Sequence, residues 1–510
     1  MASTYRSTRC ATDQTLSFED VVMTGLAHDG GLFVPSTIPK LNTTVLEEWE
    51  HLSFNELAYE VMRPYISRDE IPESDLRDLI SKSYSSFRST QVTPLKELNK
   101  KQGLYLLELF HGPTYAFKDV ALQFVGNLFE YFLEKHNRGI DDEGHKKKIT
   151  VVGATSGDTG SAAIYGLRGK KNVSVFILYP TGRVSPIQEE QMTTVEDANV
   201  HTFSVNGTFD DCQDIVKQIF GDRDFDQKYN VGAVNSINWA RILAQMTYYF
   251  YSFFQLKKLL GPDEENSKVR FVVPSGNFGD ILAGFYAKSM GLPIDKLIIA
   301  TNENDILDRF LKSGKYERGG EVKATFSPAM DILISSNFER LLWYLIRDNS
   351  ASKSDNEAGR VLVDWMQQLK ISGSFSATDL VVQQARKDFE SAKVTDNETI
   401  TTIREVYDSD TTKYVLDPHS AIGVKATFDF MNQDIEENLK NIKYISLATA
   451  HPAKFSEVVD KALSSVEGYC FEKDVLPEEL KQLSEKKKRI TLIDDVSVEQ
   501  VKRKIIEKLS

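Results

Sequence analysis

Cysteine and histidine are scarce in this 510-residue sequence, which contains three cysteines (Cys10, Cys212 and Cys470) and eight histidines. The widely spaced cysteines provide neither a disulfide framework nor a CxxC metal pair, and the histidines form no HExxH motif. We therefore expect no metal ion and a reducing compartment, which we predict to be the cytoplasm. No apolar run approaches the roughly 18 residues of a membrane span, so we expect no membrane association.

Basic residues are also fewer than acidic residues. The sequence has 61 Lys and Arg against 74 Asp and Glu, a net charge of −13. Proteins that bind nucleic acid usually have an excess of basic residues. We therefore expect a small-molecule substrate and no nucleic acid. The basic run 486–489 lies between acidic segments and is interpreted as a solvated face. The length predicts about two to four domains, and the protein is expected to be a monomer or a homodimer.

The apolar pattern divides the chain into three regions. Residues 1–95 are predicted to be mostly helical. Residues 96–235 and 236–510 are predicted to form two α/β domains, because short apolar runs alternate with segments of helical period. The polar segment 350–410 is interpreted as an insertion or lid outside the core. The predicted strands are Leu104–Phe110, Ile149–Val152, Val173–Leu178, Val269–Val273, Leu297–Ala300 and Tyr444–Ala448, and the predicted helices include Phe18–Leu26, Phe54–Tyr65, Phe209–Phe220 and Ala240–Leu259.

Two glycine-rich loops each join a predicted strand to a predicted helix. Gly153–Gly160 follows the strand Ile149–Val152, and Pro274–Asp280 follows the strand Val269–Val273. Free backbone N–H groups at a helix N-terminus favour an anion, and glycine lets the ligand approach closely. A tight turn that needs glycine for its geometry alone is the alternative for either loop. Two such loops in one α/β chain favour a phosphorylated ligand, although neither matches the Walker A or GxGxxG pattern.

A lysine stands at the start of another predicted helix. Apolar residues recur with helical spacing from Phe117 to Leu133, so Lys118 falls in the first turn, where the helix dipole repels a cation. Partial burial would also favour the neutral amine, which Schiff-base chemistry requires. From helix position alone, a surface lysine beside Asp119 is the favoured alternative.

Taken together, these stretches resemble the threonine synthases, pyridoxal-phosphate enzymes of the tryptophan-synthase-β-like fold (fold type II, an α/β class). The matches run through most of the chain in the family's order, and the length is similar to that of the longer microbial and fungal branch. A match that begins at Tyr5 leaves little room for a transit peptide. The matching stretches are Tyr5–Arg9, Gly25–Pro35, His111–Asp119, Ala154–Gly160, Asn235–Gln245, Pro274–Asp280, Ser335–Leu342, Asp417–Gly423 and Ala448–Phe455.

The resemblance implies pyridoxal 5'-phosphate as the cofactor and Lys118 as the lysine that forms a Schiff base with it. Thr449 is implied as the hydroxyl that meets the pyridine nitrogen, which would leave that nitrogen largely unprotonated. For Asn238 and Arg241, a purely structural role at a helix start is an equal alternative to substrate binding. The implied phosphate cradle of the cofactor is Ser275, Gly276, Asn277, Phe278, Gly279 and Asp280, and the implied substrate-binding residues are Ser156, Asp158, Thr159, Asn238 and Arg241.

The implied activity is that of a carbon–oxygen lyase acting on phosphates. O-phospho-L-homoserine and water become L-threonine and phosphate, the last step of threonine biosynthesis. In this reading Lys118 removes the Cα proton and the cofactor ring accepts the electrons. Two alternatives stay open, because a fold does not fix a function: a related phospho-lyase that releases 2-oxobutyrate, and a non-catalytic protein that binds pyridoxal phosphate.

Overall fold

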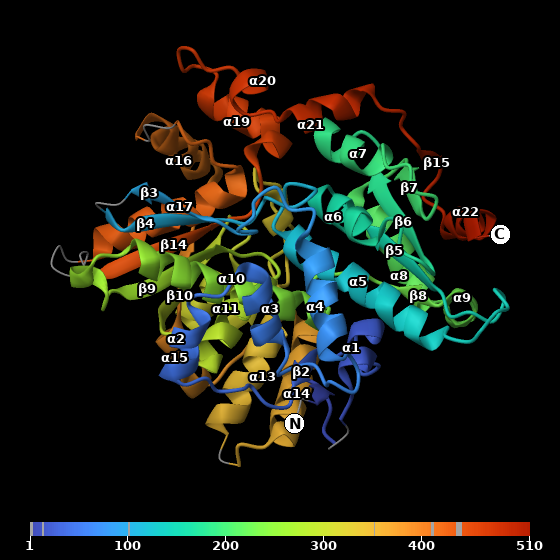
Figure 1. Ribbon diagram of the computed structural model, residues 1–510, viewed down its shortest axis with the longest axis horizontal. Helices are drawn as coiled ribbons and strands as arrows, with labels where there is room; N and C mark the ends of the chain where they lie inside the picture. Colours follow the sequence, from blue (N-terminus) through green and yellow to red (C-terminus); the bar gives the residue numbers. More distant parts are fainter. Residues whose placement is uncertain are drawn as a thin grey trace.

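The computed structural model describes residues 4–12, 15–99, 102–350, 352–409, 413–434 and 441–509. Two α/β layers lie side by side, each built on a largely parallel sheet (Figure 1). Such layers follow from the strand–helix alternation of the sequence, because each sheet must bury both faces under helices. The predicted α/β class and all six predicted strands are confirmed.

The larger sheet has six strands in the order β13-β10-β9-β14-β4-β3, all parallel except for the antiparallel pair β3–β4. Successive side chains along a strand point to opposite faces of the sheet and pack in two separate hydrophobic cores. In β9, Phe271 and Val273 face the core shared with α10 and α11, whereas Val272 faces the core shared with α17. The strands are β3 (Leu95–Asn99), β4 (Leu104–Glu108), β9 (Lys268–Pro274), β10 (Ile294–Thr301), β13 (Phe389–Lys393) and β14 (Ile442–Ala448), and these helices are α10 (Trp239–Leu259), α11 (Gly279–Met290) and α17 (Pro418–Gln433).

The smaller sheet has five parallel strands in the order β15-β7-β6-β5-β8. Helix α8 packs on β5 and β6 and also contacts α22, while α6 packs on β6 and contacts α5 and α7. The strands are β5 (Ile149–Ala154), β6 (Val173–Pro180), β7 (Val200–Val205), β8 (Val231–Gly232) and β15 (Thr491–Ile493), and the helices are α5 (Lys118–His136), α6 (Asp158–Leu167), α7 (Pro186–Thr193), α8 (Phe209–Gly221), α9 (Arg223–Tyr229) and α22 (Val498–Leu509).

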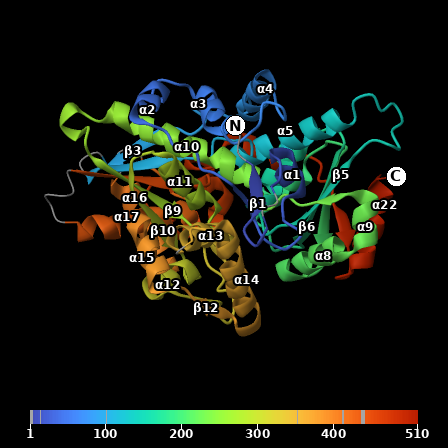
Figure 2. The ribbon, with the colours of Figure 1, turned by 90° about the horizontal axis from the view of Figure 1, so that it is seen from below.

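The N-terminal region is mostly helical, as predicted. Its helices lie along one side of the molecule (Figure 2), where α3 packs on α10 and α4 packs on α5. Tyr5 anchors the start of the chain, because its hydroxyl donates to the Tyr65 carbonyl over 2.6 Å and accepts from Trp239 over 3.1 Å. The elements are β1 (Tyr5–Ser7), α1 (Phe18–Thr24), β2 (Phe33–Pro35), α2 (Thr43–Trp49), α3 (Phe54–Met62) and α4 (Glu73–Tyr84).

The two sheets do not follow the predicted boundaries at residues 95 and 235. Strands β3 and β4 join the larger sheet, and the C-terminal β15 crosses over to the smaller one, so that the red segment in Figure 1 runs from one layer to the other. Local periodicity predicts a strand but not its neighbours, because sheet membership depends on long-range pairing. The remaining C-terminal elements are α19 (Ser456–Leu463), α20 (Phe471–Asp474) and α21 (Glu478–Lys481).

The segment 350–410 belongs to the larger layer, which corrects its interpretation as an insertion or lid. Its strand β13 pairs with β10, and its helices pack on α13 and α17. The polar residues that suggested a lid stand at the starts of α14 and α16, where Ser354 and Thr395 accept hydrogen bonds from first-turn amides. The elements around this segment are α12 (Ile306–Ser313), β11 (Lys315–Glu317), α13 (Phe338–Asn349), α14 (Asp355–Ser372), β12 (Ser374–Ser376), α15 (Asp379–Asp388) and α16 (Asp396–Ser409).

Two further expectations can be compared with the structure. The basic run 486–489 is exposed, as predicted, and Lys488 Nζ lies 3.5 Å from Glu190 Oε1. Within the described ranges, no helix is long and apolar enough to cross a membrane.

Candidate active site

A cavity with a volume of about 1870 Å³ opens between the two layers. It lies where β5, β9 and β14 end, and parallel sheets of this kind bind ligands at the carboxyl ends of their strands. Both glycine-rich loops line it, together with Lys118, Arg241 and Thr449. The structure therefore brings together residues that lie more than 300 positions apart in the sequence.

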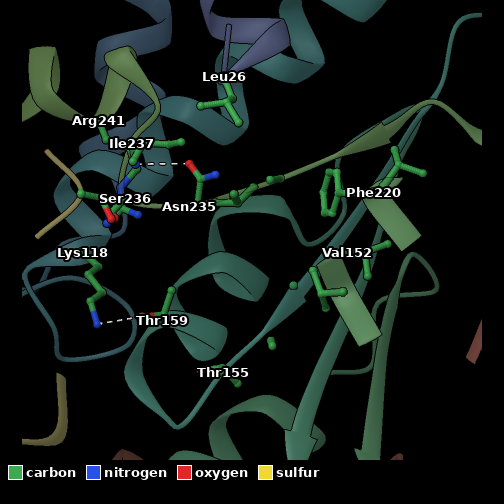
Figure 3. Close-up of a pocket in the computed structure, with 18 of the residues that line it drawn as sticks. Leu26, Lys118, Val152, Thr155, Thr159, Phe220, Asn235, Ser236, Ile237 and Arg241 are labelled. Carbon is green, nitrogen blue, oxygen red and sulfur yellow. Dashed lines mark hydrogen bonds between the residues drawn. The ribbon is translucent and has the colours of Figure 1, made fainter. Parts of the chain in front are cut away.

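Lys118 is the first residue of α5 and projects into this cavity (Figure 3). Its Nζ donates to the Thr159 hydroxyl over 2.9 Å. Burial lowers the pKa of Lys118 to about 8, against the opposing charge of Asp158 and with the help of Arg241. The alternative of an ordinary surface lysine does not fit this environment, since a partly neutral amine at the wall of a cavity is available for chemistry.

Close contact between α5 and α6 sets the distance between Lys118 and Thr159. A Cβ atom on Gly126 would lie 1.8 Å from the Gly166 carbonyl oxygen, and one on Gly166 would lie 2.5 Å from the Leu122 carbonyl oxygen. The two helices can approach this closely because neither glycine carries a side chain. The separation between the lysine and the loop before α6 is thus fixed by backbone contact.

Thr449 follows β14 and lies beside the start of α5. Its carbonyl accepts from the Phe117 amide over 2.7 Å, and its amide donates to the Ser420 hydroxyl over 3.0 Å. An antiparallel bridge between Ala116 and Ala450 continues this pairing. The Thr449 hydroxyl makes no hydrogen bond to a described residue, so it remains available to a ligand in the cavity.

The loop 274–280 leads from β9 into α11 and presents open backbone to the cavity. No described side chain caps α11, and Phe278, at the N-cap, has the left-handed conformation with φ of 63°. A Cβ on Gly276 would lie 3.0 Å from Met330 Cα, which explains why glycine is needed there. The first-turn amides of α11 lack intrahelical acceptors and suit an anion.

Side chains of this loop serve different purposes. The Ser275 hydroxyl donates to the Val273 carbonyl over 2.9 Å, and the Asn277 carbonyl accepts from the Asn337 side chain over 3.0 Å. The Phe278 ring is buried against Phe338. The Asp280 carboxylate accepts from the hydroxyls of Tyr248 and Tyr249. Several side chains of this loop are therefore engaged by other protein groups, and its backbone amides are the groups best suited to an anion.

The loop 153–160 leads from β5 into α6, whose N-cap residue, Gly157, has no side chain to cap the helix. The Thr155 hydroxyl stiffens the loop by accepting from the amides of Gly157 (3.0 Å) and Gly160 (2.9 Å). Ser156 is exposed and lines the cavity. Asp158, which also lines the cavity, is held by two partners: its carboxylate lies 2.7 Å from Lys454 Nζ and accepts from Gln188 over 2.8 Å.

Arg241 is a buried cation at the start of α10. It lines the cavity from the first turn of α10, its Nε has no hydrogen-bond partner, and no described carboxylate pairs with it. Burial lowers its pKa to about 10. Buried arginines are normally paired, so this one suits an anionic ligand.

Asn238 has the structural role that the sequence left open. It caps α10 by accepting from the Ala240 amide over 3.0 Å and donates to the Val22 carbonyl over 2.9 Å. Unlike Arg241, it is not among the described residues that line the cavity. Its contact with substrate stays a prediction.

Three residues near the cavity were not predicted. His419 lines it, with Nδ1 2.9 Å from Asp417 Oδ1 and Nε2 3.3 Å from the Ala329 amide nitrogen. Gln188, which also lines the cavity, and Lys454, which is not among the described lining residues, both contact the Asp158 carboxylate. His419 and Lys454 lie in motifs that the sequence comparison had noted, whereas Gln188 carried no signal.

The cavity thus combines a partly neutral lysine amine with two open helix N-termini, one at each glycine-rich loop. On this fold, these features define a pyridoxal-phosphate-dependent enzyme of fold type II, and a family model described as pyridoxal-phosphate dependent enzyme matches residues 85–363. Models of the threonine synthase N terminus and of the threonine synthase C-terminal region match residues 4–84 and 420–505. The chain belongs to the threonine synthase family.

Relatives match along the whole chain. Threonine synthase of Saccharomyces cerevisiae is 62% identical, over 99% of this chain and 98% of its own length. The crystal structure of threonine synthase from yeast superposes with a TM-score of 0.95, over 99% of this chain and 98% of that one. A structure of threonine synthase from Brucella melitensis with bound pyridoxal phosphate has 41% identity and a TM-score of 0.87, over 99% of both chains. The predicted family, fold, cofactor and enzyme class are confirmed.

Proposed function

We propose that this enzyme converts O-phospho-L-homoserine and water to L-threonine and phosphate. The observation that carries the proposal is the unpaired Arg241 in the same cavity as Lys118. The reaction needs places for two phosphate groups, one on the cofactor and one on the substrate. Two open helix N-termini and a buried guanidinium meet that requirement, since arginine can hold a phosphate through two N–H groups.

The cofactor fits the residues around the cavity. Lys118 would hold its aldehyde carbon, the backbone of 275–280 its phosphate, and the Thr449 hydroxyl its ring nitrogen. The uncapped start of α11 supports the phosphate assignment, because its first-turn amides are available to an anion. When bound, the cofactor serves as an electron sink for the substrate's Cα.

Lys118 is proposed to move the protons. A pKa of about 8 leaves roughly a quarter of a lysine amine neutral at pH 7.5, compared with about one in a thousand at the ordinary value. The neutral amine takes the Cα proton, a Cβ proton follows, and phosphate leaves Cγ with the electron pair of the C–O bond. A proton then returns to Cγ, the hydroxyl of a water molecule adds at Cβ while the other proton of that water passes to the departing phosphate, and Lys118 last returns a proton to Cα.

The substrate is proposed to lie between the loop 153–160 and Arg241. Arg241 holds the phosphate, while Ser156 and the open amides of α6 face the substrate's carboxylate. Thr159 keeps Lys118 directed toward the cavity over 2.9 Å. A carboxylate and a phosphate on one substrate explain why two separate anion-binding elements face the same space.

Product analysis tests the proposal. The full-length enzyme, incubated with O-phospho-L-homoserine, should release threonine and phosphate in equal amounts, with an absorbance band between about 400 and 430 nm. Phosphate accompanied by 2-oxobutyrate would instead identify a phospho-lyase. A band without phosphate release would leave a cofactor-binding protein.

The role of Arg241 has its own test. Arg241→Met should lower kcat/KM by about 10- to 100-fold, since it removes charged hydrogen bonds to the phosphate. Arg241→Lys should restore part of this loss. Arg404→Met, which removes a surface arginine paired with Asp408, serves as the matched control and should leave kcat/KM unchanged. Equal activity of the Arg241→Met and control variants would contradict the assignment.

Compartment and assembly remain predictions. The three cysteines are all free, which supports a reducing compartment such as the cytoplasm. A monomer or a homodimer is still expected, and gel filtration with light scattering would distinguish them.

A further inference from the structure

Lys454 is a buried ammonium group just outside the cavity, in the short 3-10 helix η4 (Pro452–Phe455). Its side chain has no exposed surface, and its Nζ lies 2.7 Å from Asp158 Oδ1 and donates to the Thr114 carbonyl over 2.7 Å. It is not among the described residues that line the cavity, so it has no direct route to substrate. None of the roles proposed above uses it.

Both partners of Lys454 lead to Lys118. Thr114 lies in the loop before α5 and holds the neighbouring Asp119 through its amide (2.8 Å) and its hydroxyl (2.7 Å). Asp158 directly precedes Thr159, whose hydroxyl accepts from Lys118. One ammonium group therefore joins the two segments that surround the reactive amine.

Charged groups face Lys118 from several elements. Asp158 of α6 and Asp119 of α5 favour its protonated form, whereas Arg241 of α10 and Lys454 disfavour it. His419 of α17 faces Asp158 from another side. Without Lys454, the Asp158 carboxylate would offer its full charge to Lys118, because Gln188 is a neutral partner.

We infer that Lys454 is a positioning residue that neutralises Asp158 and so keeps the Lys118 amine available as a base. The inference rests on the role proposed for Lys118. It also gives Asp158 a function other than substrate binding. Its carboxylate would repel an anionic substrate, but here it anchors the start of α6 to Lys454. The pair thus sets both the place and the proton affinity of the amine.

The test titrates Lys118 directly in full-length protein from which the cofactor has been removed. Brief acetic anhydride labelling across a pH series, followed by mass spectrometry of the peptide containing Lys118, gives a labelling midpoint, expected near pH 8 for the unaltered chain. Lys454→Met should raise the midpoint by about one pH unit or more, because it removes a cation and exposes Lys118 to Asp158. Lys454→Arg keeps the charge and should shift the midpoint by less than about half a unit.

Substitution of Asp158, alone and together with Lys454→Met, completes a double-mutant cycle. Asp158→Asn should lower the midpoint, since Asp119 alone then opposes Lys454 and Arg241, and the double variant should fall between the two single variants. In the cofactor-loaded enzyme, the acid limb of the kcat profile for phosphate release should move in the same directions. If the enzyme released no phosphate, the proposed function would fail, while the labelling midpoints would still test Lys454.

A second buried lysine provides the control. Lys443 lies at the opposite end of β14 from Thr449 and pairs with Glu264 over 2.6 Å. Lys443→Met should destabilise the fold without moving the midpoint of Lys118. The inference is overturned if Lys454→Met leaves the midpoint unchanged or lowers it, or if Lys443→Met raises it equally. If Lys454→Met does not fold, an unchanged midpoint in Asp158→Asn overturns the inference instead.

Discussion

The two glycine-rich loops share a local pattern but differ in what surrounds them. Each follows a parallel strand, leads into a helix whose N-cap residue makes no side-chain cap, and places an aspartate in the first turn. Burial disfavours the charge of both aspartates. The nearby charges of Lys454 and Lys118 nevertheless hold the pKa of Asp158 at about 2, whereas Asp280 has two tyrosine partners and its pKa rises to about 6.

This difference shows that the same motif can be adapted to two tasks. The loop before α6 lies beside the reactive lysine, where a permanent negative charge must be balanced by a buried cation. The loop before α11 is proposed to hold the cofactor phosphate, where a readily protonated carboxyl limits repulsion. In both loops the neighbours contributed by other segments decide the charge.

The largest effect is expected from the side chain that lies in the cavity shared by both loops. Lys118→Ala removes the proposed base and should lower kcat for phosphate release by at least about 1000-fold. It should also abolish the absorbance band of the loaded enzyme. Lys135→Ala, at the other end of α5, is the control and should retain normal kcat. Full turnover by Lys118→Ala would show that the cavity is not the active site.

Next in size is the loss of charge at the loop before α6. Asp158→Asn leaves Lys454 buried without a counter-ion and should destabilise the protein by about 3–5 kcal/mol at pH 7. Because the folded pKa of Asp158 is depressed, its stabilising contribution is complete above about pH 4 and is lost as the pH falls toward 2. Thermal unfolding at pH 7 measures the effect. An unchanged midpoint would mean that the ion pair contributes nothing.

At the loop before α11, replacing the aspartate with asparagine should stabilise the protein, whereas Asp158→Asn should destabilise it. The folded pKa of Asp280 is raised, so the protein loses stability as the pH rises from about 4 through about 6. Asp280→Asn removes that loss and should stabilise the protein by up to about 3 kcal/mol at pH 8 and by about half as much at pH 5. Calorimetry at the two pH values tests this, and destabilisation at pH 8 would contradict the contrast between the loops.

The smallest effect is expected on cofactor affinity, when a substitution shifts the backbone of the loop before α11. Gly276→Ala brings a Cβ within 3.0 Å of Met330 Cα, so the loop must shift and cofactor binding should weaken by about 10-fold. Gly261→Ala is the control, because its added Cβ meets nothing within 4 Å. Cofactor dissociation, followed by absorbance, provides the measurement. Equal affinities in the two variants would remove the proposed role of the loop backbone.

Much of the site could be predicted from the sequence because its parts are local. A helix start, a glycine-rich turn and the spacing of apolar residues each depend on a few neighbouring residues. The positions of Lys118 and of both loops were therefore predicted correctly. Asn238 and Arg241 show what local pattern cannot predict. Both lie at the start of α10, but of the two only Arg241 is among the described residues that line the cavity.

The sequence by itself determined the α/β alternation, the two anion-suited helix starts and the lysine in the first turn of α5. Only the tertiary structure decided that β15 returns to the smaller sheet and that segment 350–410 lies within the larger layer. The tertiary structure also decided the pKa of Asp158, because that pKa depends on Lys454. Lys454 comes from a segment 340 residues beyond Thr114, whose carbonyl it also contacts. Such partners depend on strand register and packing between distant elements, which no local pattern specifies.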